Sequence, residues 1–346
     1  MGKQVDAGKL KAMLEHIGNE NDLKTLRLGA DANDNVPPLS AAETIKENMS
    51  TEQWKAVGDL MDGRIVPRGM LATMFSIVQP IGRPSFIVSN NDFPVDLAWR
   101  HLDSALMHAR ISQALRAVGT IVVPDSFETL CGTGFLVGDR LVMTNRHVAE
   151  NFSYDLDAAT PPFRTVAPLI DFHREKSSPP GDTSGQVPIE KVVMVHPTLD
   201  IVLLRLKFMP PGIKPLVLSS TPPKRQDEIA VMGYPRAYRP DDDIERAIFD
   251  NTYDVKRLAP GQITGLAYSA ERGLDVLTHD SSTLPGNSGS PALDLRTGLV
   301  IGVHYRGDGE EEDGMQHDAK GKANYLVPSA ALAANATLRQ LGVQFA

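Results

Sequence analysis

The chain has 346 residues, 42% of them hydrophobic and 23% charged, which is the composition of an ordinary globular protein with room for two domains. Its 35 basic and 43 acidic residues give a net charge of −8 and form no basic patch, so we expect no nucleic-acid partner. No stretch approaches the roughly 18 apolar residues of a membrane-spanning helix, and we expect no membrane partner either.

Cys131 is the single cysteine, which excludes a disulfide within the chain. Small secreted domains often depend on disulfides, whereas a reducing compartment prevents them. The first residues also lack the apolar segment of a secretory signal. We therefore expect a cytoplasmic protein. Cys131 lies inside an apolar strand pattern, which favours a buried structural thiol over a nucleophile or a metal ligand.

The first part of the chain shows helical patterns. Apolar residues recur at helical spacing at Leu10, Met13, Leu14 and Ile17. The segments Ser40–Glu43 and Ser50–Gln53 each match a capping box, in which a hydroxyl and a carboxylate or amide bind the free amides at a helix start. The second capping box predicts a helix with one apolar face that ends near Gly63.

The next residues are predicted to connect this helical part to the rest of the chain. Residues 78–94 are rich in proline, glycine and asparagine, which predicts a loop. Residues 95–117 fit one longer helix with an apolar stripe at Val95, Ala98, Leu102, Ala105, Leu106 and Ala109. We expect residues 1–77 to be a helical adaptor or regulatory region that recruits a partner, and 78–118 to be a loop and connecting helix. A packing extension of the following domain is the alternative.

From Thr120 onwards, short β-branched runs alternate with glycine and proline turns, which indicates a barrel or sandwich. The predicted strands are Thr120–Val123, Gly134–Val137, Leu141–Thr144, Val192–Val195, Ile201–Leu206, Ile229–Met232, Ile263–Tyr268, Val276–Thr278 and Leu299–His304. Residues 328–341 predict a closing helix. The acidic runs Asp241–Asp243 and Glu310–Asp313 lack the spacing of a calcium loop and predict exposed loops.

Three segments of this β-rich part carry residues suited to hydrolysis. His147 ends the run Leu141-Val-Met-Thr-Asn-Arg-His, Asp200 ends His196-Pro-Thr-Leu-Asp, and Ser288 lies in Gly286-Asn-Ser-Gly-Ser-Pro. A serine hydroxyl becomes a good nucleophile when an imidazole takes its proton and a buried carboxylate orients that imidazole. Each segment alone is more often structural. The three together, in this order, indicate a catalytic triad.

Amide hydrolysis also places negative charge on the carbonyl oxygen of the substrate, and backbone N–H groups are suited to stabilise it. Gly286 lets the backbone turn so that the N–H groups of Gly286 and Ser288 converge on one point. The sequence therefore predicts an oxyanion hole at these two residues.

At these residues the chain resembles the trypsin-like peptidases and, within them, the glutamyl endopeptidase branch. The matching segments are Gly132-Thr-Gly-Phe-Leu-Val, Thr144-Asn-Arg-His-Val, Leu199-Asp-Ile-Val-Leu-Leu, Gly233-Tyr-Pro, Gly286-Asn-Ser-Gly-Ser-Pro and Ile301-Gly-Val-His. The resemblance implies a mainly β fold over residues 119–346, with two antiparallel six-stranded β-barrels of the chymotrypsin-like kind after the α-helical N-terminal region. It implies a serine endopeptidase acting on proteins or peptides without a cofactor or metal.

The resemblance also assigns roles to individual residues. His147 is the general base, Asp200 its orienting partner and Ser288 the nucleophile. In the glutamyl branch, a threonine and a histidine at the places of Thr283 and His304 line the primary specificity pocket. Both side chains donate hydrogen bonds to a carboxylate, which implies a preference for Glu or Asp on the acyl side of the cut bond. The alternative is that His304 merely ends a buried strand.

Other classes fit less well. An α/β-hydrolase would have Gly-x-Ser-x-Gly around its nucleophile, and the residue after Gly289 is Ser290. No histidine pattern matches a zinc hydrolase. An HtrA-like protease would need a further peptide-binding module after the barrels. A protease fold used as a binding or scaffold module, with latent activity controlled by the N-terminal helices, remains as the alternative function.

Because about 118 residues precede the predicted barrels, we expect the full chain to be less active than a matured or partner-bound form.

Overall fold

The computed structural model describes residues 7–17, 41–124, 129–164, 166–269, 273–307, 315–317 and 324–346. The chain divides into two compact units. The helical unit consists of Met1–Pro84, Val95–Ser104 and Arg239–Asn251, and the barrel unit consists of Ser85–Pro94, Ala105–Tyr238 and Thr252–Ala346. No helix of the described part is long and apolar enough to cross a membrane.

The helical unit packs its helices around an apolar core of its own. The helices are α1 (Ala7–Ile17), α3 (Ala41–Glu47), α4 (Thr51–Met61), α5 (Arg68–Gly82), the 3₁₀ helix η1 (Leu97–Asp103) and α8 (Asp243–Phe249). The predicted apolar positions Leu10, Met13 and Leu14 are buried in that core. The capping box of α4 is confirmed, since Ser50 Oγ accepts from the N–H of Gln53 and the Gln53 side chain accepts from the N–H of Ser50. The other predicted capping box begins at a residue outside the described ones.

The loop predicted over residues 78–94 is wrong at its start. Helix α5 continues to Gly82 with Pro80 inside it. Leu71, Met74 and Val78 are all buried, so the helical spacing of the core residues extends further than the proline suggests. A proline near the end of a helix removes one hydrogen bond, and the packing of the apolar face outweighs that loss.

The single helix predicted over residues 95–117 is also wrong. It is divided into η1 and α6 (Ala105–Arg116), with Ser104 in an extended conformation between them. Trp99 and Leu102 are buried in the helical unit, whereas α6 buries Ile111 and other residues in the barrel unit. Leu106, placed on the predicted stripe, is 72% exposed. The apolar residues serve two different cores, so no single stripe is needed.

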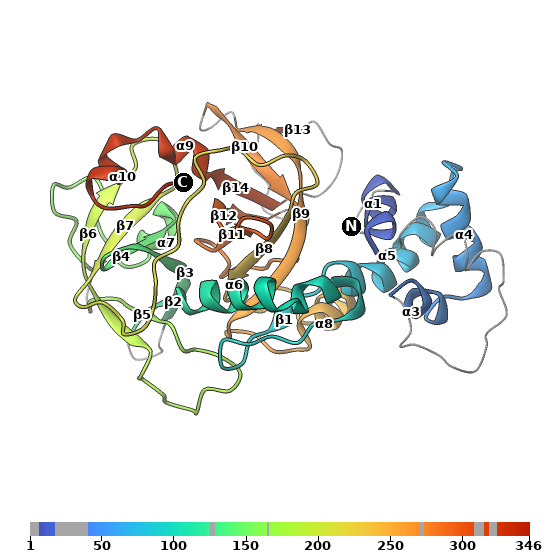
Figure 1. Cartoon of the computed structure of the whole chain (residues 1–346), viewed down its shortest axis with the longest axis horizontal. Coiled ribbons are helices and arrows are strands. Elements are labelled where there is room, and N and C mark those ends of the chain that lie inside the picture. The colour runs from blue at the N-terminus through green and yellow to red at the C-terminus, as the bar shows by residue number, and fades with distance from the viewer. Residues whose placement is uncertain are drawn as a thin grey trace. The chain divides into compact units, whose positions relative to one another are not determined.

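The barrel unit contains two closed antiparallel barrels, as predicted. The first barrel consists of β2 (Val118–Val123), β3 (Thr129–Gly138), β4 (Leu141–Thr144), β7 (Val202–Leu206), β6 (Gln186–Val195) and β5 (Leu169–Asp171), in the order in which they pair. The second barrel consists of β8 (Glu228–Gly233), β9 (Arg257–Ser269), β10 (Leu274–His279), β14 (Asn324–Pro328), β12 (Val300–Arg306) and β11 (Pro291–Asp294), closed by pairing of β11 with β8. Figure 1 shows the first set in green and yellow beside the second in orange and red.

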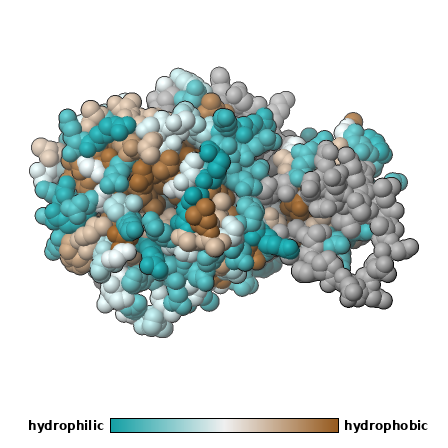
Figure 2. Space-filling model, viewed as in Figure 1, coloured by the Kyte–Doolittle hydropathy of each residue, from teal (hydrophilic) through white to brown (hydrophobic). Residues whose placement is uncertain are grey.

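Two further short strands, β1 (Phe86–Ile87) and β13 (Met315–His317), pair with the long strand β9. The fold is therefore mainly β and of the chymotrypsin-like kind, preceded by helices. Large apolar side chains fill both barrels, for example Phe135 in the first and Ile229 in the second. On the face shown in Figure 2, hydrophobic side chains appear in patches between larger hydrophilic areas.

Three smaller predictions have different outcomes. Cys131 is a free, buried cysteine, as expected. The closing helix over residues 328–341 is two short helices, α9 (Ser329–Ala333) and α10 (Ala336–Gln340), because the Asn335 side chain caps a new helix start. The run Asp241–Asp243 is a loop only in part, because Asp242 caps helix α8 and Asp243 is its first residue. The other acidic run lies outside the described residues.

A buried ion pair joins distant parts of the barrel unit. Lys256, immediately before β9, donates to Glu175 Oε1 at 3.1 Å and to the carbonyl oxygens of Leu115 and Phe172. The side chains of Lys256 and Glu175 are 0% and 4% exposed. Burial lowers the pKa of Lys256, and Glu175 opposes that effect. The pair therefore connects the end of α6, the segment after β5 and the start of β9.

Candidate active site

His147 lies on the one-turn helix α7 (Arg146–Ala149), which follows β4 of the first barrel. Its ring nitrogen Nδ1 lies 2.7 Å from Asp200 Oδ2, and its backbone N–H donates to Asp200 Oδ1 at 3.1 Å. Asp200 is 3% exposed, so its carboxylate is shielded from water while it holds the imidazole. The structure thus brings two of the predicted site residues into direct contact.

Two neighbours of this pair fix the backbone around Asp200. The Asn145 side chain donates to the carbonyl oxygen of Asp200 at 2.8 Å. His196 Nδ1 accepts from the N–H groups of Thr198 and Leu199, at 3.3 and 3.0 Å. Burial lowers the pKa of His196, which keeps the ring neutral so that Nδ1 can accept. The sequence assigned neither Asn145 nor His196 a role in the site, because both act on backbone groups: Asn145 on a distant segment and His196 on its own.

Ser288 lies in a turn between β10 and β11. We call residues Leu284–Ser290 the serine turn. Gly286 and Gly289 have φ angles of +95° and +89°. A Cβ atom on Gly286 would lie 2.3 Å from the Tyr234 carbonyl oxygen, and one on Gly289 would lie 1.9 Å from that of Thr133. Only glycine fits at these two positions. The two glycines therefore allow the backbone conformation of the turn, and this conformation determines where Ser288 lies.

Contacts around Gly132 place Ser288 near the helix that carries His147. A Cβ atom at Gly132 would lie 2.8 Å from Val148 Cγ2 and 3.0 Å from the carbonyl oxygen of Ser288. The residue after His147 and the serine turn therefore lie side by side at Gly132 of β3. Within the described residues, Ser288 Oγ and the His147 ring form no hydrogen bond. Such bonds are often long without a bound substrate.

The backbone N–H groups of Gly286 and Ser288 donate to no acceptor among the described residues. Their neighbours in the serine turn do: the N–H of Asn287 donates to the carbonyl oxygen of Leu284 at 3.1 Å, and that of Gly289 to His304 at 2.8 Å. Two N–H groups without an acceptor among the described residues, one on each side of Asn287, form an arrangement suited to binding an anion.

His304 lies on β12 next to the serine turn and is buried. Its Nδ1 lies 3.1 Å from Nε2 of His279, a second buried histidine that the sequence did not single out for this site. Burial, with smaller effects of His279 and His147, holds the pKa of His304 well below its usual range. The ring is therefore neutral near pH 7.

Thr283 lies immediately before the serine turn. Its Oγ1 is buried and has no hydrogen-bond partner among the described residues. Buried hydroxyl groups usually have a partner, so this oxygen is suited to accept or donate one bond to a ligand. Thr283 and His304 thus lie on opposite sides of Ser288 in the chain; Thr283 is half-buried with a buried Oγ1, and His304 is buried.

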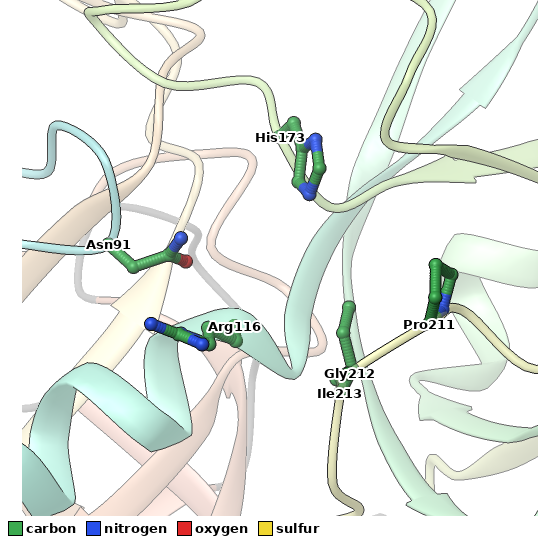
Figure 3. A pocket seen from close by; sticks show the side chains of 6 residues that line it. All are labelled: Asn91, Arg116, His173, Pro211, Gly212 and Ile213. Atoms are coloured by element: carbon green, nitrogen blue, oxygen red, sulfur yellow. The ribbon is translucent and has the colours of Figure 1, made fainter.

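A separate pocket of about 130 Å³ lies elsewhere in the barrel unit. It is lined by Asn91, Arg116, His173, Pro211, Gly212 and Ile213. Figure 3 shows these side chains around the opening, with Asn91 and Arg116 on one side and the 211–213 segment on the other. None of the predicted site residues lines this pocket, so it is not the site described above.

Comparison with known proteins identifies the family of this segment. Residues 132–303 match the trypsin-like peptidase domain. The chain is 26% identical over 198 residues to a glutamyl endopeptidase of Staphylococcus epidermidis, a match that covers 55% of this chain and 59% of the relative. It is 28% identical over 185 residues to the serine protease Rv3671c of Mycobacterium tuberculosis, covering 53% of this chain and 38% of the relative.

The chain therefore spans about 40–60% of the length of these relatives. The crystal structure of the Rv3671c protease from M. tuberculosis in its active form aligns with 21% identity and a TM-score of 0.43, over 70% of this chain and 88% of that chain. The matched segment contains His147, Asp200 and Ser288. This segment, residues 132–303, is therefore identified as a trypsin-like peptidase domain.

Proposed function

We propose that the protein is a serine endopeptidase that cuts peptide bonds through His147, Asp200 and Ser288. The observation that carries the proposal is the 2.7 Å contact between His147 Nδ1 and the buried carboxylate of Asp200. It is supported by the serine turn, in which the N–H groups of Gly286 and Ser288 donate to no acceptor among the described residues. The family match and the names of the relatives, a glutamyl endopeptidase and a serine protease, support the same activity.

The chemistry follows from this arrangement. Ser288 Oγ attacks the carbonyl carbon of the substrate while its proton passes to Nε2 of His147. Asp200 keeps the Nδ1–H of His147 oriented and stabilises the imidazolium that forms. The N–H groups of Gly286 and Ser288 stabilise the negative oxygen. The imidazolium then gives its proton to the leaving amine as the C–N bond breaks. The acyl group stays bound to Ser288 as an acyl-enzyme. Water, deprotonated by His147, releases the acid and restores the serine.

The first test is Ser288→Ala. We expect peptide hydrolysis to fall by about 10⁴- to 10⁶-fold, because the acyl-enzyme no longer forms. The fold should be unaffected, since one hydroxyl at a partly buried turn position is removed. Ser290→Ala is a suitable control, because Ser290 lies in the same turn without an assigned role in the reaction. Cleavage by Ser288→Ala within tenfold of the wild type would show that another group is the nucleophile.

The proposed preference is for Glu or Asp on the acyl side of the cut bond. Thr283 Oγ1, buried without a partner, and the neutral, buried His304 are the two hydrogen-bond donors proposed to bind the substrate carboxylate. Hydrogen bonds to a carboxylate are among the stronger ones in proteins. The name of the staphylococcal relative, glutamyl endopeptidase, supports this assignment.

Two peptides that differ only in Glu or Lys at this position test the preference. We expect the wild type to cut the Glu peptide with at least about tenfold higher kcat/KM, since one charge-assisted hydrogen bond is worth about 1.5–3 kcal/mol. His304→Ala should reduce that ratio strongly while the catalytic residues stay in place. A wild type that favours the Lys peptide would disprove the acidic pocket, and an unchanged ratio in His304→Ala would place the selectivity on other residues.

Further parts of the proposal concern the rest of the chain. We propose that residues 1–77 form an adaptor or regulatory region that binds a partner or restrains the peptidase, with 78–118 as the connection and 119–346 as the peptidase domain. The single cysteine, Cys131, supports a cytoplasmic location, since no disulfide is needed to hold the chain together.

A further inference from the structure

Four successive carbonyl groups of the serine turn are each held by a hydrogen bond. The oxygen of Pro285 accepts from the backbone N–H of Arg236 at 2.7 Å, that of Gly286 from Thr133 Oγ1 at 2.8 Å, that of Asn287 from the N–H of Ser290 at 2.9 Å, and that of Ser288 from the N–H of Thr133 at 2.8 Å. The orientation of every peptide plane from Pro285 to Gly289 is therefore fixed by a named partner.

These hydrogen bonds determine where the N–H groups of Gly286 and Ser288 point. In a trans peptide the C=O and the N–H point in opposite directions, and the chain has no cis peptide among its described residues. Because Arg236 holds the oxygen of Pro285, the N–H of Gly286 points away from Arg236. Because Ser290 holds the oxygen of Asn287, the N–H of Ser288 points away from Ser290. Both groups stay available for an anion.

Thr133 is the residue of the first barrel that holds this turn. It is fully buried on β3 and binds the turn twice, through its N–H and through its hydroxyl. The same hydroxyl accepts from the backbone N–H of Tyr234 at 3.2 Å. A hydroxyl has one proton to donate, and here the Gly286 oxygen receives it. The carbonyl oxygen of Thr133 in turn accepts from Thr144 Oγ1 at 2.7 Å, which fixes Thr133 itself.

We propose that Thr133 is a positioning residue for the oxyanion hole. Its hydroxyl holds the peptide plane between Gly286 and Asn287. This plane lies between the two planes that carry the N–H groups of Gly286 and Ser288, so holding it keeps both groups in their anion-binding orientation. This inference rests on the proposed peptidase function. It assigns a catalytic consequence to a side chain that contacts neither the substrate nor the reacting atoms. A preassembled oxyanion hole also requires no rearrangement of the serine turn before the reaction.

Valine at position 133 keeps the shape of threonine and removes the hydroxyl. The Gly286 oxygen then loses its donor, and the peptide plane between Gly286 and Asn287 keeps only the hydrogen bond from the N–H of Asn287 to Leu284. Stabilisation of the oxyanion is needed in the transition state, whereas ground-state binding does not depend on it. The change should therefore appear in kcat rather than in KM.

The experiment compares the full-length wild type with Thr133→Val, Thr133→Ser and a matched control, Thr120→Val. Thr120 pairs with Thr133 across β2 and β3, is equally buried, and donates through its hydroxyl to the Gly132 oxygen, with no bond to the serine turn. Loss of a whole oxyanion donor costs about 10²–10³ in kcat, so for Thr133→Val we expect a smaller loss of about 10- to 100-fold with KM within about twofold. Thr133→Ser and Thr120→Val should retain kcat within about threefold.

A peptide aldehyde gives the second readout, because it forms an oxyanion on Ser288. Its inhibition constant should rise in Thr133→Val by the same factor as kcat/KM falls, which a general loss of stability would not produce. Circular dichroism melting checks that each variant is folded. Should Thr133→Val not fold, Thr133→Cys takes its place, since a thiol is a weak donor of similar size, and a several-fold loss of kcat is expected.

The positioning role would be disproved by an unchanged kcat in Thr133→Val or Thr133→Cys, or by an equal loss in Thr120→Val. These outcomes differ from failure of the proposed function. A wild type that hydrolyses no peptide contradicts the peptidase assignment itself, whereas an active wild type with an equally active Thr133→Val contradicts the role of Thr133 alone.

Discussion

The buried ring of His304 makes the stability of the second barrel depend on pH. In the unfolded chain a histidine titrates near its ordinary pKa of 6.5, whereas burial holds the folded value well below that. The unfolded state therefore binds a proton that the folded state does not, once the pH falls below 6.5. We expect the stability to be fully present above pH 6.5 and to decrease as the pH falls further, by up to about 1.4 kcal/mol per pH unit for this one group.

Urea unfolding at pH 7.5 and at pH 5.5 measures this effect. His304→Gln should lose less stability between the two pH values than the wild type, because it removes the buried titrating group. His173→Asn, which removes an exposed histidine of the same unit, is the matched control and should behave like the wild type. Equal pH dependence in His304→Gln and the wild type would contradict a neutral, buried His304.

At the residue scale, the candidate site residues predicted from the sequence are those that carry a family motif. His147, Asp200 and Ser288 are in this group, and the first two are in contact. Thr133 and His279 were not predicted to act in the site, because each acts through a partner that lies far away in sequence. Thr133 is in a segment that the resemblance covers, but its bond to Gly286 becomes evident only when the two barrels are packed together.

At the scale of elements, the Lys256–Glu175 pair makes a prediction about how the barrel unit holds together. Lys256→Met leaves the Glu175 carboxylate buried without its cation and removes a donor from two carbonyl oxygens. Breaking one side of a buried ion pair typically costs about 3–5 kcal/mol. We expect a loss of this size in the free energy of unfolding, measured by urea denaturation.

The double variant Lys256→Met with Glu175→Gln is the control for this prediction. It removes the buried negative charge as well, while the glutamine oxygen can still accept from the N–H of Asn91 as Glu175 does. We expect it to recover part of the lost stability, since an unpaired buried charge is the main cost. A single variant Lys256→Met as stable as the wild type would show that the pair contributes nothing to the fold.

Elements were predictable where one periodic pattern served one core. Helix α4 and most strands of both barrels follow directly from such patterns. The breaks at Ser104 and Asn335 did not, because the first separates residues of two different cores and the second depends on a side-chain cap. Strands β5, β11 and β14 were not predicted, since short strands bounded by polar residues give a weak signal.

At the scale of the whole molecule, the contacts divide the chain differently from its linear order. The helical unit takes up Arg239–Asn251, and α8 from this segment packs against α5. The barrel unit includes Ser85–Pro94, whose strand β1 pairs with β9. Contacts between segments so far apart leave no periodic signal in the sequence. The domain limits at residues 77 and 118, and a regulatory role of the N-terminal region, stay predictions.

The central claim is that Ser288 is an activated nucleophile, and labelling of the full chain with a fluorophosphonate probe tests it most directly. The probe reacts covalently with an activated serine, and mass spectrometry of the digested protein locates the label. We expect the label on Ser288 in the wild type, much slower labelling in His147→Ala, and none in Ser288→Ala. An unlabelled wild type, as expected for a binding or scaffold module, or a label on another serine such as Ser290, would contradict the account.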